Sequence, residues 1–237
     1  DDRFHRYWNA YWEMRGRHGV TKEVARTEMR RRMTLIGAMM VQLGEADGMV
    51  CGTVGRFAEH LNFVDQVIGL KPEARTYAAM NVLLLPERTL AVVDTHVNED
   101  PSAEQIAEFT IAAAEEMRRL NLEPKAALLS RSNFGSERCQ ASEKMRRALA
   151  LIREWAPELE VDGEMHGDAA LEASIRKEIL PDSTLQGSAN LLVCPNGDSG
   201  NIAYNLLKTA AGSNVAIGPL LLGVKAPVTI LTASATV

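Results

Sequence analysis

The 237-residue chain has few cysteines and few aromatic residues, and it has no long apolar run. Its three cysteines, Cys51, Cys139 and Cys194, form no CxxC pair, which excludes a zinc ribbon and a thioredoxin motif. No apolar run approaches the ~18 residues that a membrane span needs. Because 31 acidic residues outnumber 26 basic ones, no basic excess is available to neutralise the phosphates of a nucleic acid. We therefore expect neither membrane nor nucleic-acid partners.

Motifs for metal binding and for nucleophilic catalysis are also missing. The five histidines show no HxxxH or HxH pairing, so no metal site is predicted. Neither GxGxxG nor the GxxxxGK[ST] loop occurs, and no Ser/His/Asp triad or paired-carboxylate motif stands out. Three thiols without a secretory apolar region predict a cytoplasmic location, with the cysteines as small buried hydrophobes.

A length of 237 residues fits one large domain or two small ones, and the apolar content of 46% excludes a disordered chain. Predicted strands alternate with predicted helices along the chain. The strands are expected at 48–51, 81–85, 89–94, 125–130, 159–163, 189–194, 217–223 and 227–231. The alternation predicts an α/β sheet covered by helices, with antiparallel pairing across the polar break 86–88.

The predicted helices carry several local signals. The first has an aromatic stripe at helical spacing, typical of a packing face: Phe4, Tyr7, Trp8, Tyr11 and Trp12. Thr21 is predicted to cap one long helix that reaches Gly44, and Asp100 with Pro101 to begin another. A short helix is predicted over 169–179. The run 30–32 of three arginines is either a solvated face or a contact to an anion or a partner.

Three predicted post-strand loops share small, polar residues: 52–56, 130–136 and 196–201. Ligands of α/β sheets bind beyond the carboxyl ends of strands, where loop N–H groups and helix N-termini can hold an anion. Ordinary turn chemistry is the alternative for any one of these loops. Together they favour a phosphorylated or nucleotide-like ligand.

A series of motifs resembles the phosphate acetyl/butyryltransferase family over nearly the whole chain. They are ADGMVCG at 46–52, VNEDPSAEQ at 97–105, LLS at 128–130 with GS at 135–136, VDGE at 161–164 with DAA at 168–170, GNIAY at 200–204, and IGPLLLG at 217–223. A closer resemblance is to the transferase-like C-terminal region of bacterial hybrid malic enzymes. It rests on segments 51–55, 132–136, 161–168 and 230–237.

The resemblance implies a fold of two α/β/α subdomains of the isocitrate/isopropylmalate dehydrogenase-like type, with a cleft between them. Residues 1–71 and 219–237 would form subdomain I, and residues 72–218 would form an inserted subdomain II. The resemblance also implies a segment of a longer polypeptide, without the family's first strands and last helix. A homodimer or higher homo-oligomer is expected.

Active members of the family transfer an acyl group between CoA and phosphate, and cations stabilise the developing oxyanion. Where the family has a Ser-Arg pair this chain has Thr232 and Ala233, and Asn62 matches a second family arginine. The family's catalytic Asp would fall just beyond Val237. The resemblance therefore implies an acyl-CoA-sensing domain without useful turnover. The alternatives are an active phosphate acetyltransferase and an assembly module.

The same resemblance implies a ligand-binding set with acetyl-CoA or a related acyl-CoA as the ligand, and Arg56 as the candidate substitute cation. The set is Arg15, Thr53, Gly55, Arg56, Ser130, Ser132, Asn133, Gly135, Ser136, Asn196, Asn201, Asn205, Lys208, Thr232 and Ser234. No cofactor is expected in this chain. The parent protein would oxidatively decarboxylate malate to pyruvate, with NADP and a divalent metal (Mg or Mn) in its malic enzyme domain.

Overall fold

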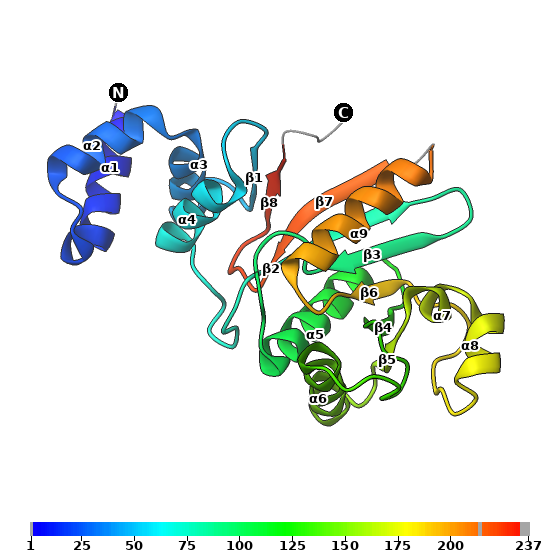
Figure 1. Cartoon of the computed structure of the whole chain (residues 1–237). Coiled ribbons are helices and arrows are strands. Elements are labelled where there is room, and N and C mark those ends of the chain that lie inside the picture. The colour runs from blue at the N-terminus through cyan, green and yellow to red at the C-terminus, as the bar shows by residue number, and fades with distance from the viewer. Residues whose placement is uncertain (1, 213–214, 233–237) are drawn as a thin grey trace. The chain divides into compact units, whose positions relative to one another are not determined.

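The computed structural model describes residues 2–212 and 215–232. The chain divides into two compact units (Figure 1). Unit 1 consists of the chain up to Glu73 and of the chain from Val224 onward. Unit 2 is Ala74–Gly223. No helix among the described residues is long and apolar enough to cross a membrane.

Unit 1 combines helices with one pair of strands. Its elements are α1 (Asp2–Arg15), η1 (Gly16–His18), α2 (Lys22–Arg31), α3 (Met33–Gln42), β1 (Met49–Gly52), α4 (Phe57–Val67) and β8 (Val228–Leu231). The two strands pair in parallel, and their register ends with Gly52 opposite Leu231. The carboxyl ends of β1 and β8 therefore lie side by side.

The aromatic stripe of α1 packs as predicted, with Tyr7, Trp8 and Tyr11 buried. The stripe also meets α2 through three cation–ring contacts, each one helical turn from the next. Lys22 lies 4.4 Å from the Trp12 ring centroid, Arg26 lies 4.2 Å from that of Trp8, and Arg30 lies 5.2 Å from that of Phe4. Such contacts contribute about 0.5–1 kcal/mol each at exposed sites. They fix α2 against α1.

The prediction of one helix from Thr21 to Gly44 is wrong, although Thr21 does cap its start by accepting from Val24 N–H. The helix breaks at Arg32, whose φ of -111° and ψ of 96° are extended. No glycine or proline marks the break. Its cause is a shift in the apolar period, because α2 buries Ala25 and Met29 whereas α3 buries Leu35 and Met39. The break leaves Arg32 exposed.

Unit 2 is built on a six-stranded sheet with the order β7-β2-β3-β6-β4-β5. Strand β2 pairs antiparallel with β3 and β7, and the other neighbours are parallel. The predicted hairpin across 86–88 is confirmed. The elements are β2 (Ala78–Leu84), β3 (Thr89–Val93), α5 (Ala103–Arg119), β4 (Lys125–Leu129), α6 (Gln140–Trp155), β5 (Glu160–Met165), α7 (Gly167–Leu171), α8 (Ala173–Ile179), β6 (Leu191–Val193), α9 (Gly197–Ala210) and β7 (Val215–Leu222).

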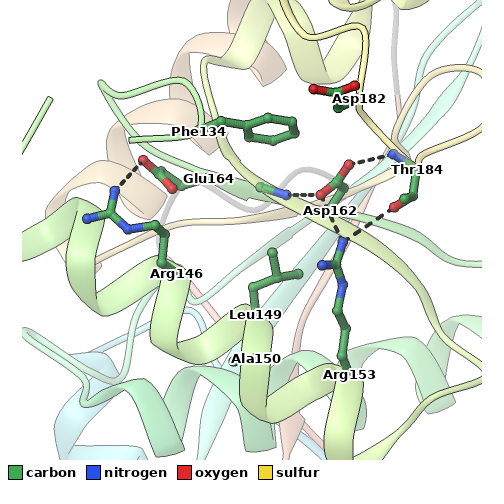
Figure 2. A pocket seen from close by; sticks show the side chains of 10 residues that line it. Phe134, Arg146, Leu149, Ala150, Arg153, Asp162, Glu164, Asp182 and Thr184 are labelled. Atoms are coloured by element: carbon green, nitrogen blue, oxygen red, sulfur yellow. Dashed lines mark hydrogen bonds and ion pairs between the residues drawn. The ribbon is translucent and has the colours of Figure 1, made fainter. Parts of the chain in front are cut away.

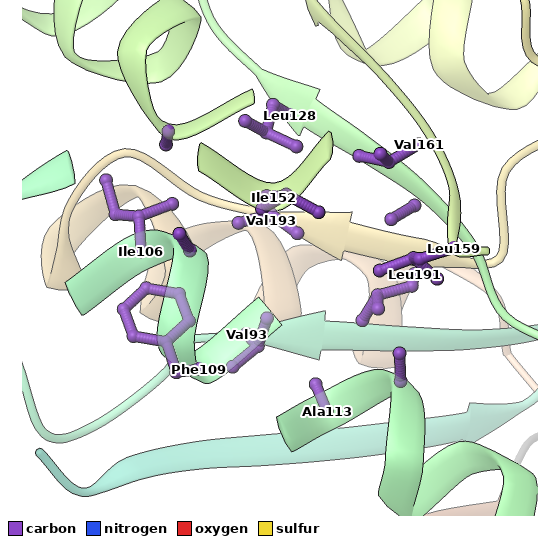
Figure 3. Packing of buried hydrophobic residues seen from close by; sticks show 14 of the residues in the cluster. Val93, Ile106, Phe109, Ala113, Leu128, Ile152, Leu159, Val161, Leu191 and Val193 are labelled. Carbon is purple, nitrogen blue, oxygen red and sulfur yellow. The ribbon is translucent and has the colours of Figure 1, made fainter. Parts of the chain in front are cut away.

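Helices cover both faces of this sheet. On one face, strand side chains such as Val93 and Leu128 pack with Phe109 of α5 and Ile152 of α6 (Figure 3). A second cluster on the other face joins strand residues to α7 and α9: it comprises Leu83, Val92, Ala127, Met165, Ala169, Ala170, Leu180, Leu185, Ala189, Leu192, Cys194 and Tyr204. Neighbouring strand residues alternate between the clusters, as a two-sided sheet requires. The predicted α/β class with helix-covered sheet is confirmed.

Two predicted helix boundaries are wrong. The helix expected to begin at Asp100-Pro101 begins after Ser102, whose hydroxyl and Gln105 form a reciprocal capping box. The helix predicted over 169–179 is two helices that meet at Glu172, where the backbone is extended. The predicted subdomain limit at 218/219 falls inside β7, which pairs with β2 out to Leu222, so the structural division follows Gly223.

Candidate functional site

A pocket of about 620 Å³ lies in unit 1, where the chain leaves β1 and turns into α4. Its lining comes from the break between α2 and α3, from β1 and its turn, and from α4. The lining residues are Arg31, Arg32, Met33, Thr34, Gly37, Met49, Val50, Cys51, Gly52, Thr53, Val54, Gly55, Glu59, His60 and Phe63. The predicted glycine-bearing turn thus forms one wall of the pocket.

The backbone of this turn suits an anion. Gly52, Thr53 and Gly55 have φ values of 99°, 68° and 103°. A Cβ on Gly52 would lie 2.1 Å from Leu231 O, so only glycine fits against β8. Within the described residues, no backbone carbonyl accepts the N–H groups of residues 54–56, which lead into the 11-residue helix α4. Free N–H groups at such a helix start attract negative charge.

The charge of the lining points the same way. The lining holds two arginines, Arg31 and Arg32, and one acid, Glu59. The Glu59 carboxylate is already paired with Arg56, whose Nη2 lies 2.7 Å away. Arg32 also pairs with Glu28 and lies over the Phe63 ring, 5.9 Å from its centroid, which fixes the direction of its guanidinium. Unit 1 holds twelve Lys and Arg against ten Asp and Glu, whereas unit 2 holds fourteen against twenty-one. The acidity of the chain therefore belongs to unit 2.

Cys51 is the one thiol in this lining, and burial raises its pKa to about 11, against a smaller lowering by a hydrogen bond with Thr34. The thiolate is the nucleophilic form of cysteine, so at neutral pH Cys51 is a weak nucleophile. The pocket is thus equipped to hold an anion rather than to attack a bound group through this thiol.

The predicted site residues of unit 1 separate into two groups. Thr53 and Gly55 line the pocket, and Thr232 directly follows β8, beside the turn. Arg15, Arg56 and Asn62 are not among the lining residues, and the Arg56 side chain is 85% exposed in its pair with Glu59. Ala233 and Ser234 lie outside the described residues.

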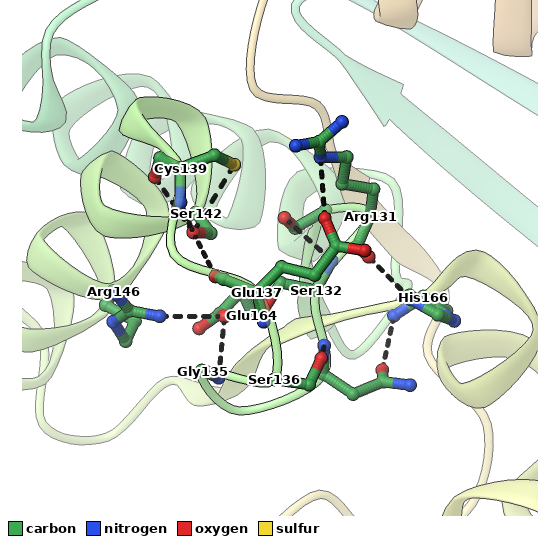
Figure 4. Close-up of polar contacts among 12 residues, drawn as sticks. Arg131, Ser132, Gly135, Ser136, Glu137, Cys139, Ser142, Arg146, Glu164 and His166 are labelled. Carbon is green, nitrogen blue, oxygen red and sulfur yellow. Dashed lines mark hydrogen bonds and ion pairs between the residues drawn. The ribbon is translucent and has the colours of Figure 1, made fainter.

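In unit 2 the loop 130–136 wraps around a buried carboxylate that sequence reasoning missed (Figure 4). Glu164 Oε1 accepts from Ser132 Oγ at 2.7 Å and from Gly135 N–H at 2.9 Å. Arg146 Nη1 lies 3.0 Å from the same oxygen. The other predicted loop residues bond within the loop and its surroundings: Ser130 Oγ accepts from Ser132 N–H, Ser136 Oγ from Asn133 N–H, and Asn133 Oδ1 from His166 N–H. The loop is ordered around Glu164.

A second missed carboxylate, Asp94, directly follows β3 and organises the backbone there. It is 1% exposed and accepts from the backbone N–H of Ala79, His96, Val97 and Asn98. Asp94 ends one predicted strand, and Glu164 directly follows another. This placement was the sequence signal that could have identified them.

The segment 196–201, predicted as a loop, is the N-cap and first turn of α9. Asn196 caps the helix by accepting from Ser199 N–H, and Asn201 donates to Thr95 O at 3.1 Å. Asn205 donates back to Asn201, and Lys208 lies 5.9 Å from the Tyr204 ring centroid. The predicted α9 residues therefore share one helix beside the Asp94 loop.

Unit 2 also has a shallow pocket of about 460 Å³ along α6 (Figure 2). Its two arginines are already matched with acids, since Arg146 contacts Glu164, and Arg153 Nη2 lies 3.1 Å from Asp162 Oδ1. This pocket offers less unmatched positive charge than the pocket of unit 1. Over the described ranges, no group of three or more His, Cys, Asp or Glu could hold a metal ion.

His96 gives unit 2 a predicted pH response. Desolvation lowers the pKa of His96 from 6.5, with Asp94 opposing the shift. The unfolded chain then binds a proton at a higher pH than the folded chain, so this contribution to stability is complete above pH 6.5 and falls as the pH drops. We expect His96→Gln to flatten the loss of stability between pH 7 and 5, measured by urea unfolding. An unchanged slope in the variant would contradict this assignment.

Comparisons with known proteins agree with this architecture. The family model described as Phosphate acetyl/butaryl transferase matches residues 1–237. The NADP-dependent malic enzyme of Escherichia coli (strain K12) is 52% identical over 237 residues, which are 100% of this chain and 31% of that protein. The phosphate acetyltransferase of Corynebacterium glutamicum is 35% identical and is covered to 71%. A phosphotransacetylase structure from Streptococcus pyogenes has a TM-score of 0.86 at 32% identity, covering 99% of this chain and 70% of that one.

Proposed function

Because the chain belongs to the phosphate acetyl/butyryltransferase family, we propose that it is an acyl-CoA-sensing domain that binds its ligand without useful turnover. The resemblance to malic enzymes supports a regulatory role, since this chain spans about a third of the length of the malic enzymes it matches. The parent protein would then be an NADP-dependent malic enzyme.

One observation carries the proposal: the pocket of unit 1 keeps the equipment for binding an anion, while the positions that match the family's cations are neutral. Unmatched N–H groups of the turn, together with Arg31 and Arg32, can hold a phosphate or a thioester carbonyl. The matched positions carry Asn62 and Ala233, and Arg56 is engaged by Glu59. Binding and catalysis require different groups, and this arrangement supports binding without turnover.

The apolar part of the lining suits the acyl and pantetheine portions of the ligand. Met33 and Val54 are 81% and 82% exposed, and the aromatic side chain of Phe63 also lines the pocket. Large apolar side chains so exposed commonly mark binding surfaces. A ligand with both a phosphate group and an apolar arm would cover them.

Regulation would require that acyl-CoA bind one state of the parent enzyme more tightly than another, typically by 1–3 kcal/mol of coupling. The same proposal includes a malic enzyme domain with NADP and Mg or Mn in the parent, a cytoplasmic location and a homo-oligomer. The predicted ligand set in unit 2 belongs to it as well.

An active phosphate acetyltransferase is the second candidate. The similarity to the enzyme of Corynebacterium glutamicum, which covers most of both chains, favours it. Turnover separates the two candidates, because both predict that acyl-CoA binds.

Calorimetric titration of the chain with acetyl-CoA tests the proposal. We expect saturable binding, and a loss of about tenfold in affinity for Arg31→Ala combined with Arg32→Ala, because hydrogen bonds to charged groups contribute about 1.5–3 kcal/mol when well formed. The matched control is Arg17→Ala, since Arg17 is an exposed arginine of η1 that does not line the pocket. This variant should bind acetyl-CoA as tightly as the unchanged chain does. Absence of binding in the unchanged chain would reject the proposal.

A further inference from the structure

His60 connects the two walls of the pocket in unit 1 through both of its ring nitrogens. Nδ1 lies 2.6 Å from Thr34 Oγ1 on α3, and Nε2 lies 2.9 Å from the carbonyl oxygen of Val54 in the turn. Thr34 is buried, at 6% exposure. The buried Thr34 side chain on α3 therefore fixes the orientation of the His60 ring. The ring in turn fixes the orientation of the Val54 carbonyl in the turn.

The partners decide the tautomer of His60. The Val54 carbonyl can only accept, so Nε2 must carry the hydrogen. In the neutral ring, Nδ1 is then an acceptor, and the Thr34 hydroxyl donates to it. The Val54 carbonyl thus selects the tautomer, because the opposite one would place two lone pairs face to face at the turn. The Thr34 hydroxyl, which can donate or accept, completes this arrangement by donating to Nδ1.

Holding the Val54 carbonyl also orients the next N–H group. The peptide between Val54 and Gly55 is planar and trans, so the Gly55 N–H points opposite to the Val54 carbonyl, away from His60. This N–H is among those that no described backbone carbonyl accepts. Gly55, with φ of 103°, tolerates the reversed peptide orientation as well, so local backbone preference alone does not fix it.

We propose that His60, held by Thr34, is a positioning residue that keeps the Val54–Gly55 peptide turned so that its N–H, and not its carbonyl oxygen, faces an anionic ligand. The inference rests on the proposed binding of acyl-CoA and names the group that pre-orders that site. The contact would strengthen binding because it holds the peptide in the bound orientation before the ligand arrives. With the peptide reversed, a carbonyl dipole would meet the negative charge, so binding would first have to turn the peptide back.

Two substitutions separate the role of the donor from that of the ring. A glutamine amide nitrogen can take the place of Nε2, so His60→Gln keeps a donor for Val54 O. An asparagine side chain reaches only as far as Nδ1, so His60→Asn keeps a partner for Thr34 and loses the donor. We expect His60→Gln to bind acetyl-CoA within about threefold of the unchanged chain, and His60→Asn about tenfold more weakly.

Variants on the other side of the ring test the role of Thr34. Thr34→Ser keeps the hydroxyl, and Thr34→Val removes it with nearly the same shape. We expect the serine variant to bind normally and the valine variant to lose affinity. His5→Asn, on the exposed side of α1, is the control for a lost imidazole. Thermal unfolding of each variant separates lost binding from lost folding.

The proposal is overturned if His60→Asn binds as tightly as the unchanged chain, or if His60→Gln binds as weakly as His60→Asn. A readout without ligand keeps it separate from the proposed function. In the nitrogen-15 NMR spectrum of the imidazole rings, we expect His60 in the Nε2–H tautomer. The Nδ1–H tautomer would show that His60 does not hold the Val54 carbonyl. If the unchanged chain does not bind acetyl-CoA, the proposed function fails. The spectrum alone then decides whether His60 holds the Val54 carbonyl.

Discussion

Acetyl phosphate and CoA, mixed with this chain, are expected to yield acetyl-CoA at well below about one turnover per second, the lower end of ordinary enzyme rates. The physical reason is the loss of fixed positive charge where an oxyanion and a phosphate dianion would develop. Removal of one such stabilising group typically lowers the rate by about 10²–10³. Here the two matched positions carry Asn62 and Ala233.

Arg56, the one substitute considered from the sequence, does not line the pocket and is paired with Glu59. Arg31 and Arg32 do line it, and we propose that they hold the bound anion. A spectrophotometric assay of the thioester measures the rate. Asn62→Arg combined with Ala233→Arg is expected to raise any residual rate, and Asn62→Gln is the control that changes size without charge. Ordinary turnover by the unchanged chain would show that it is a working transferase.

Arg176→Met is expected to destabilise unit 2 by about 3–5 kcal/mol, the range for breaking a buried charged interaction. Arg176 lies on α8 with 2% of its surface exposed. Its guanidinium donates to the carbonyls of Ala169 at 2.9 Å and Leu185 at 3.1 Å, and also to those of Ala170 and Gly187. Methionine fills much of the volume but removes the guanidinium donors from these four carbonyls, which is the costly event, although Ala170 O keeps its bond from Ala189 N–H.

The adjacent Lys177 provides a matched control, because it is exposed on the same helix. Lys177→Met should change stability by no more than about 0.5 kcal/mol, as surface substitutions usually do. Urea unfolding followed by circular dichroism measures both variants. If Arg176→Met were as stable as Lys177→Met, the four carbonyl contacts would not hold α7 and the segment before β6 together as described.

The sequence was most informative where local patterns and packing agree. The α1 stripe, the hairpin across 86–88 and the helix-covered sheet follow from periodicity and turn chemistry, and the structure has all three. It was less informative where tertiary contacts choose between local options. Nothing local distinguishes Arg32 as a helix break, and Ser102 competes with Asp100 as a cap on nearly equal terms.

The site shows the same limit. The glycine turn could be recognised from its residues, and Thr53 and Gly55 do line a pocket. His60, however, is one histidine on a helix in the sequence, and only the fold brings Thr34 and the Val54 carbonyl to its two nitrogens. Glu164 belongs to the VDGE motif at 161–164. Its role in ordering the loop 130–136 nevertheless depends on contacts between β5 and the loop that follows β4.

The most direct test of binding at the unit 1 pocket is a titration with acetyl-CoA followed amide by amide in nitrogen–proton correlation NMR spectra. We expect the N–H signals of Val54, Gly55 and Arg56 to shift together, with the dissociation constant found by calorimetry. The Val24 N–H, bonded to the Thr21 hydroxyl at the start of α2 and outside the pocket lining, is the internal reference. If the signals of residues 54–56 stay in place while acetyl-CoA binds, the ligand does not use this turn and the proposed binding site is wrong.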